Sequence, residues 1–289
     1  MKNYKWLFFI LITIVTQGIW GAFSELPEKE GFPATFTFIV WSFSMIPCAI
    51  IAFGLAGWKF EYDKKSLLLG CVIGFLGAGG QLILFETLRF GPAYIVFPFI
   101  SMTPMIVITL SLIFLKERPS KKQILGIITA LAAIFFLSWQ GGQSNGNSSG
   151  FLWVILASLI LVMWGIQGTV IKLANETMRA ESIFIYMTIT GLMLAPIAYL
   201  MTDFDMPGIN FDMGLVTKSF FIQILNAIGV LTLVFAYRYG KAIIVSPMEG
   251  LAPVVTVILS LVIYSVFPST LMLTGMILAV IAMVTLSLE

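Results

Sequence analysis

Eight long runs without a single charged side chain take up most of this sequence. They lie at 6–24, 31–58, 66–85, 90–115, 123–171, 182–202, 219–237 and 250–288. A helix that spans a bilayer needs about 20 mostly apolar residues, so nearly every run is long enough for one. Only 10% of the residues are charged, against roughly 25% in soluble domains. The predicted fold class is therefore all-α integral membrane, with the lipid bilayer as its surroundings.

Two of these runs are too long for one helix. A Gly/Ser/Asn linker, "QGGQSNGNSSG" at 140–150, divides the run 123–171. Pro268 divides the last run, whose first helix is expected to begin upstream, near Ala242. Ten transmembrane helices result. They are expected at about 5–23, 35–57, 67–88, 93–115, 121–139, 151–173, 181–201, 218–237, 242–265 and 270–288.

The basic residues predict the orientation, because Lys and Arg accumulate in cytoplasmic loops. With the N-terminus inside, thirteen of them fall in inner segments, and only Lys29, Arg89 and Lys218 fall in outer ones. We therefore expect both termini to be cytoplasmic and the chain to be a multi-pass protein of the cytoplasmic (inner) cell membrane.

An internal repeat divides the chain. Residues 89–138 align with 238–287 without a gap, and eighteen of the fifty positions are identical, shared Pro and Gly positions among them. A Trp-Gly pair also occurs in the first expected helix of each half, at Trp20-Gly21 and Trp164-Gly165. The sequence thus predicts two five-helix units, 1–139 and 151–289, joined by the linker 140–150.

Because five is odd, the second unit must enter the membrane in the opposite orientation to the first. The loop charges agree: "KERPSKK" at 116–122 is strongly basic, whereas its counterpart "SVFPST" at 265–270 is uncharged. Inverted-topology repeats are the architecture of secondary transporters, in which a site at the repeat interface opens alternately to each side.

At this point the chain resembles a family. Ten helices in two inverted units, the repeated Trp-Gly pair and "LKERPSKKQILGIITALAAI" at 115–134 are similar to EamA-type members of the drug/metabolite transporter superfamily. The resemblance implies a central cavity lined mainly by the first, third and fourth helices of each unit. It also implies transport of small organic metabolites, often as export. The second unit lacks the Lys-Glu-Arg cluster, so Glu117 is not treated as a catalytic group.

Glu249 is the first candidate for chemistry. It alone interrupts an otherwise uncharged stretch from Ala242 to Leu288, and its repeat counterpart is Ile100. A charged side chain near the centre of a spanning helix costs roughly 2.5 to 3.5 kcal/mol on translocon scales. The functional interpretation is a proton-coupling or amine-binding carboxylate. The structural alternative is an ion pair with Arg238 or Lys241.

Polar and aromatic side chains in the expected cavity helices are the other candidates. Buried amides orient a polar ligand at less cost than a full charge, but they also form hydrogen bonds between helices. Aromatic rings either stack on a substrate or anchor the membrane interfaces. The candidates are Gln17, Gln81, Gln167 and Asn226 among the amides, and Trp20, Trp164 and Tyr237 among the aromatics.

Paired prolines are expected to shape the cavity. Proline removes a backbone hydrogen bond and bends or interrupts a helix, and freed carbonyl groups at membrane depth are tolerated where they line a cavity. The pairs are Pro98 with Pro104, and Pro247 with Pro253. "GCVIGFLGAGG" at 70–80 and the repeated Gly126 and Gly275 are interpreted as helix-packing surfaces.

The residues that an enzyme active site or a metal site would need are not found in this sequence. The chain has no histidine and no Walker loop, and its aspartates lie in loops, so we predict no enzyme, no metal site and no cofactor. A net charge of +2 indicates no nucleic-acid partner. The predicted function is proton-coupled secondary transport of a small organic metabolite, with export favoured, by a monomer or homodimer. The alternatives are an uptake permease and a channel-like protein.

Overall fold

The computed structural model describes residues 4–24, 26–90, 96, 99–100, 102–138, 152–204, 208–252, 254–256, 258–259 and 269–287. All regular elements within these ranges are helical. They are α1 (Lys5–Phe23), α2 (Leu26–Lys29), α3 (Ala34–Leu55), α4 (Lys64–Phe90), α6 (Thr103–Leu110), the π-helix η1 (Ser111–Leu115), α7 (Lys121–Ser138), α8 (Leu152–Ala174), α9 (Ala180–Met201), α10 (Met213–Tyr239), α11 (Ala242–Glu249) and α13 (Thr270–Ser287).

The predicted all-α membrane class is confirmed. Six helical segments of the described chain are long and apolar enough to cross a membrane: Lys5–Lys29, Ala34–Leu55, Lys64–Leu84, Leu152–Ala174, Ala180–Met201 and Met213–Tyr239. Shorter apolar helices lie at Thr103–Leu115, Ala242–Thr256 and Leu273–Leu286. The expected helices at 93–115 and 242–265 lie partly outside the described residues, so the count of ten stays a prediction.

Two expected boundaries differ from the structure. α10 begins at Met213 rather than near residue 218, because the Asp212 carboxylate accepts a hydrogen bond of 2.8 Å from the Gly214 backbone N–H and caps the helix. Lys218, expected as the first residue of this helix, therefore lies in its second turn, where it forms an ion pair with Glu30. The acidic stretch after α1, expected as loop, contains the single helical turn α2.

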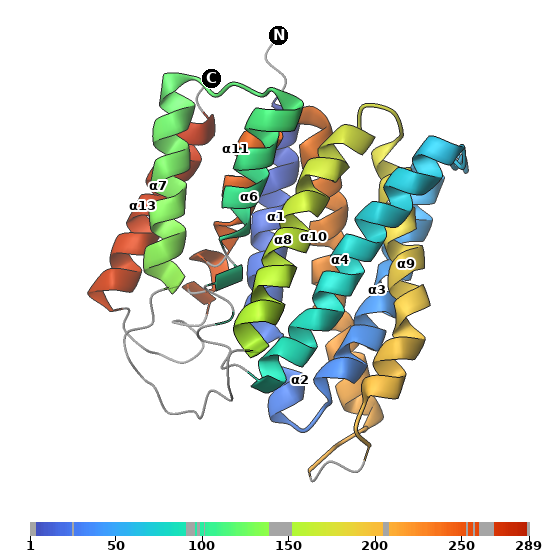
Figure 1. Cartoon of the computed structure of the whole chain (residues 1–289). Coiled ribbons are helices and arrows are strands. Elements are labelled where there is room, and N and C mark those ends of the chain that lie inside the picture. Colours follow the sequence, from blue (N-terminus) through green and yellow to red (C-terminus); the bar gives the residue numbers. More distant parts are fainter. Residues whose placement is uncertain are drawn as a thin grey trace.

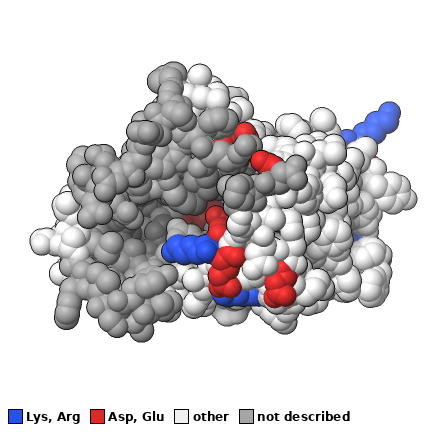
Figure 2. Space-filling view, turned by 90° about the horizontal axis from the view of Figure 1, so that it is seen from below, with Lys and Arg blue, Asp and Glu red and all other residues white. Residues whose placement is uncertain are grey.

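The long helices lie side by side, and both chain termini are at the same end of the bundle (Figure 1). We call this the terminal end. Following the chain, α1 runs away from the terminal end, whereas α8 runs toward it (Figure 1). α3 runs toward the terminal end and α9 away from it, whereas α4 runs away from it and α10 toward it (Figure 1). Seen from the opposite end, acidic side chains gather on one part of the surface, with basic side chains among them (Figure 2).

Packing between helices follows a symmetric pattern. α1 packs against α10, and α8 packs against α4; α3 packs against α10, and α9 against α4. α3 also packs against α9, α6 against α11, and α7 against α13. In chain order, α1, α3, α4, α6 and α7 of residues 1–139 correspond to α8, α9, α10, α11 and α13 of residues 151–289. When each helix is replaced by its counterpart, this set of contacts is unchanged.

The glycines of α4 lie in its helix contacts, as expected for a packing surface. A Cβ atom at Gly77 would lie 2.1 Å from the Gln167 side chain of α8, and one at Gly74 would lie 2.2 Å from the Thr190 side chain of α9. At these two positions only glycine allows the helices to approach as they do. Gly126 of α7 meets Leu286 of α13 in the same way.

The short helix α11 lies inside the bundle. Residues 242–248 are all buried, and α11 contacts α1, α6, α7, α8, α10 and α13. Pro247 lies within it, and the helix ends at Glu249, where the Gly250 N–H bonds back to Ser246 and Met248. An interrupted helix is what the proline pattern predicts. Pro104 begins α6 and is buried, whereas Pro98 and Pro253 lie outside the described residues.

Candidate functional site

Glu249 is the last residue of α11, where the helix breaks. A Cβ atom placed on the next residue, Gly250, would lie 3.2 Å from Pro104 and 2.6 Å from Ile134. The break therefore packs against both α6 and α7 of the other half of the chain. A carboxylate at a helix C-terminus faces the negative end of the helix dipole, so Glu249 is stabilised there by protonation or by an accompanying cation.

The two basic residues considered as partners of Glu249 are engaged elsewhere. Arg238 donates a hydrogen bond of 3.3 Å to the Met178 carbonyl, and the Lys241 ammonium donates one of 3.2 Å to the Arg118 carbonyl. Within the described part of the chain, no ion pair joins either of them to Glu249. The structural alternative is thus not formed in this structure.

Tyr237 is the neighbour of Glu249 on α10. Its side chain is 1% exposed, and it interacts with Ser246 of α11 and electrostatically with Glu249. A Cβ atom at Gly168 of α8 would lie 2.9 Å from its hydroxyl oxygen. Tyr237 is therefore enclosed between α8, α10 and α11.

Gln17 and Asn226 belong to a chain of hydrogen bonds across three helices. The Asn226 amide of α10 donates a hydrogen bond of 2.9 Å to Gln17 Oε1 of α1. Asn226 Oδ1 accepts one of 2.7 Å from the indole N–H of Trp41 in α3. Both predicted amides thus form helix-to-helix bonds, while the Gln17 amino group keeps its donors for other partners.

Further polar contacts join α1 to α10 on either side of this chain. The Trp20 indole N–H donates a hydrogen bond of 2.9 Å to Gln223 Oε1. The hydroxyl oxygens of Thr13 and Thr232 lie 2.9 Å apart. Trp20 is therefore held by a side-chain amide within the bundle.

The equivalent interface between α8 and α4 contains fewer polar side chains. The Trp164 indole N–H donates a hydrogen bond of 3.3 Å to the Gly77 carbonyl, and the Gln167 amide donates one of 3.2 Å to the Ile73 carbonyl. Gln81, further along α4, is partly buried and has no hydrogen-bond partner among the described residues. The two halves therefore present different polar groups to the centre of the protein.

Two charged side chains hold the corner between α10 and α11 at the terminal end. The Glu117 carboxylate, just after η1, accepts hydrogen bonds from the Ala242 and Ile243 backbone N–H groups at 3.0 and 2.9 Å. The Lys172 ammonium of α8 donates bonds of 3.1 and 2.7 Å to the Tyr237 and Gly240 carbonyls. The Glu117 carboxylate binds the N-terminus of α11, and the Lys172 ammonium binds the C-terminus of α10. Each charge therefore interacts favourably with the dipole of the helix that it binds. We call this set the corner clamp.

Comparison with known protein families gives a match along nearly the whole chain. The EamA-like transporter family matches residues 4–139 and, a second time, residues 149–288. This chain belongs to the EamA-like transporter family. It is therefore a multi-pass membrane protein of a family that transports small solutes, and the resemblance inferred from its motifs is confirmed.

Two similar proteins add little about substrate. The uncharacterised protein MJ1333.1 of Methanocaldococcus jannaschii is 37% identical over 76 residues, which is 26% of this chain and 56% of that protein. The chain thus spans about half the length of this relative. A protein of known crystal structure is 16% identical and aligns over 100% of this chain and 99% of its own, with a TM-score of 0.77. At that identity, the likeness shows the fold alone.

For this EamA-like chain, sequence reasoning missed several polar residues of the bundle. Gln223 lies three residues before Asn226, a spacing that places both on one helix face. Trp41 and Lys172 gave no such signal, because their partners lie in helices distant in sequence. Among the described residues, no group of three or more acidic or cysteine side chains could hold a metal ion.

Proposed function

We propose that this protein is a proton-coupled secondary transporter that exports a small polar metabolite across the cytoplasmic membrane by alternating access. Amino acids, nucleosides, sugars and drug-like solutes are the substrate classes considered. The corner clamp and both termini then face the cytoplasm, and the acidic end shown in Figure 2 faces outward. The chain supplies the site by itself, as a monomer or as each copy of a homodimer.

Symmetric packing supports a five-plus-five inverted repeat. Helices at equivalent places in the two halves run in opposite directions (Figure 1), and their contacts exchange with one another. The family match falls on two successive ranges, 4–139 and 149–288. Two structurally related halves of opposite orientation allow one site to be exposed to either side by a similar motion of each half.

The position of Glu249 is the main support for proton coupling. Glu249 is half-buried at the break of α11, it interacts electrostatically with Tyr237, and Gly250 next to it packs against α6 and α7 of the other half. A proton or an amine that neutralises the carboxylate lowers the cost of keeping it in the membrane. Proton binding and substrate binding at one carboxylate exclude each other, which couples export of the substrate to entry of protons.

The polar groups around the centre favour a neutral or amine-bearing polar solute. Gln17 and Gln81 supply hydrogen-bond donors, and the described central residues include no lysine or arginine directed at Glu249. A phosphorylated substrate would favour buried basic side chains, since Arg and Lys are the usual phosphate partners. The substrate proposed here therefore carries no phosphate.

Flux in proteoliposomes tests the function. Purified protein is reconstituted, a pH gradient is imposed, and a panel of radiolabelled amino acids, nucleosides and sugars is screened. Export coupled to protons requires the substrate to move opposite to the proton gradient. Movement with the protons would identify an uptake permease, and ion currents at channel-like rates without coupled flux would contradict transport.

Glu249→Gln tests the coupling role. The amide has the size of the carboxyl group but does not ionise, so we expect the variant to fold and to lose the pH dependence of transport. Glu176→Gln, at an exposed position outside the helices, is the control. Unchanged pH dependence in Glu249→Gln would exclude this residue from coupling.

A further inference from the structure

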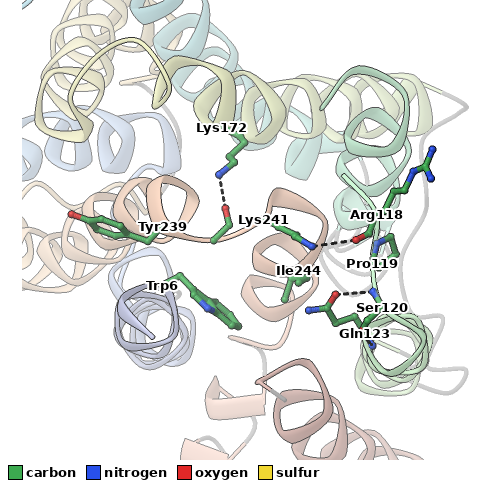
Figure 3. Close-up of a pocket in the computed structure, with 10 residues that line it drawn as sticks. Trp6, Arg118, Pro119, Ser120, Gln123, Lys172, Tyr239, Lys241 and Ile244 are labelled. Atoms are coloured by element: carbon green, nitrogen blue, oxygen red, sulfur yellow. Dashed lines mark hydrogen bonds between the residues drawn. The ribbon is translucent and has the colours of Figure 1, made fainter. Parts of the chain in front are cut away.

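A cavity of about 610 Å³ lies at the terminal end of the bundle, away from Glu249. It is bounded by α1, by the segment between η1 and α7, by α8 and by the corner between α10 and α11 (Figure 3). We call it the terminal pocket. Its volume falls within the range of about 300 to 1,000 Å³ that small-molecule sites occupy.

The lining of the terminal pocket is basic. Arg118, Lys172 and Lys241 come from three separate segments, and none of its lining residues is acidic. Two carboxylates outside this lining, Glu117 and Glu176, interact electrostatically with Lys172, and both oxygens of Glu117 accept hydrogen bonds from α11. Figure 3 shows the Arg118 guanidinium extending away from the other lining residues, so the positive charge beside this space comes from the Lys172 and Lys241 ammonium groups.

The two lysines keep hydrogen-bond donors for a ligand. An ammonium group has three N–H donors. Lys172 uses two of them on the Tyr237 and Gly240 carbonyls, and Lys241 uses one on the Arg118 carbonyl. These carbonyl contacts hold the two ammonium groups in place, so their remaining donors are positioned before any ligand arrives.

Two neutral donors complete the lining. Gln123 is 5% exposed, and its Oε1 accepts a hydrogen bond of 2.9 Å from the Ser120 N–H, which leaves the amino group of its amide to donate (Figure 3). Trp6 is also 5% exposed, and its indole N–H has no acceptor among the described residues. This indole N–H is therefore available to donate a hydrogen bond to a bound anion.

We propose that the terminal pocket binds a phosphate group. Its donors come from several directions, which suits a tetrahedral phosphate better than a planar carboxylate. Two sources share this chemistry: a soluble phosphate compound of the cytoplasm, and the head group of an anionic lipid in the inner leaflet. Basic pockets between transmembrane helices on the cytoplasmic side bind lipid head groups of this kind. The site is separate from the proposed transport site.

Binding is measured on the purified full-length protein, without transport. In the first arm, inorganic phosphate is titrated in a phosphate-free detergent and followed by ³¹P NMR line broadening. In the second, nanodiscs of phosphatidylglycerol or of phosphatidylcholine are compared by native mass spectrometry for lipid that stays bound. Phosphate binding in the first arm identifies a soluble source, and selective retention of phosphatidylglycerol identifies a lipid; either result supports the site.

Lys241→Gln is the decisive variant, because this exposed side chain caps no helix, whereas Lys172 does. We expect about tenfold weaker binding, the effect of losing one charge-assisted hydrogen bond. Trp6→Phe should also weaken binding while preserving the aromatic packing. Lys122→Gln is the control, because it removes the same charge from an exposed position outside the pocket. The affinity of this variant for phosphate or lipid should stay within about twofold of that of the unchanged protein. Absence of binding in both arms, or equal losses in Lys241→Gln and Lys122→Gln, would overturn the proposal.

Discussion

At the scale of single residues, the polar side chains of the bundle divide into those already bonded and those still available. Asn226 uses both ends of its amide, one on Gln17 and one on Trp41. Gln81 has no partner among the described residues. From the sequence, both residues are candidates for substrate contact. An amide in an apolar helix gives the same sequence signal whether it bonds to another helix or to a ligand.

Asn226→Leu should therefore destabilise the protein. The change leaves Gln17 Oε1 and the Trp41 N–H without their partner in a buried place. Each lost bond between membrane helices costs roughly 1 kcal/mol, so we expect the free energy of unfolding in detergent to fall by about 2 kcal/mol. Chemical unfolding followed by tryptophan fluorescence measures it.

Gln81→Leu is the matched comparison. The same change of side chain there removes no hydrogen bond to the described protein, so the unfolding free energy should stay within about 0.5 kcal/mol of its original value. If Gln81 contacts the substrate, the KM of transport should rise about tenfold. A destabilisation as large as that of Asn226→Leu would place Gln81 among the structural amides instead.

At the scale of helices, α4 is shaped by its glycines. Gly70 lies against the Tyr186 ring, to which an added Cβ would come within 2.2 Å, and the Tyr186 hydroxyl is held by a bond of 2.8 Å to the Glu61 carbonyl. Gly70→Ala should therefore lower the unfolding free energy by about 1 to 3 kcal/mol through overpacking. An added Cβ at Gly54 would lie 4.0 Å from the Trp58 side chain, its nearest neighbour. Gly54→Ala should therefore raise the unfolding free energy by up to about 1 kcal/mol, because alanine favours the helix α3. Similar effects of the two changes would contradict the packing role of Gly70.

The corner clamp is the second feature at this scale, and it joins α11 to the other half of the chain. Glu117→Ala removes the carboxylate that accepts from the Ala242 and Ile243 N–H groups. In a variant with Cys48 and Cys71 replaced by alanine, a Val245→Cys reporter in buried α11 should then react several-fold faster with a maleimide. Lys121→Ala, an exposed change at the start of α7, is the control. An unchanged labelling rate would show that the clamp does not hold α11 in place.

The clamp also shows where prediction from sequence ends. "KERPSKK" is visible as a basic loop, and the absence of a matching cluster in the second half made Glu117 an unlikely chemical group. Its structural role depends on α11 beginning beside it, 125 positions later in the chain. Hydropathy and charge determine which segments become helices, whereas such a contact depends on how distant helices pack.

At the scale of the whole molecule, more could be predicted, because a bilayer restricts the choices. The length of the apolar runs predicted an all-α membrane protein, and the repeated Pro, Gly and Trp-Gly positions pointed to the family that the full comparison confirms. The end of α11, two residues after Pro247, agrees with the proline pattern of the sequence. The depth and exposure of the centre could not be predicted, since they depend on the angles between helices that no local pattern specifies.

Orientation is the remaining prediction at this scale, and it follows from charge alone. Ser120 directly precedes α7, which begins at the terminal end, and lies among Lys116, Arg118 and two further lysines in the sequence, whereas Asn210 lies shortly before α10, which begins at the opposite end (Figure 1), and is close to Asp212 in the sequence. With the native cysteines replaced by alanine, Asn210→Cys should react with a membrane-impermeant maleimide in intact cells. Ser120→Cys should react only after permeabilisation, because the positive-inside bias places its loop in the cytoplasm. The reverse pattern would invert the proposed topology and would turn the corner clamp and the terminal pocket toward the outside.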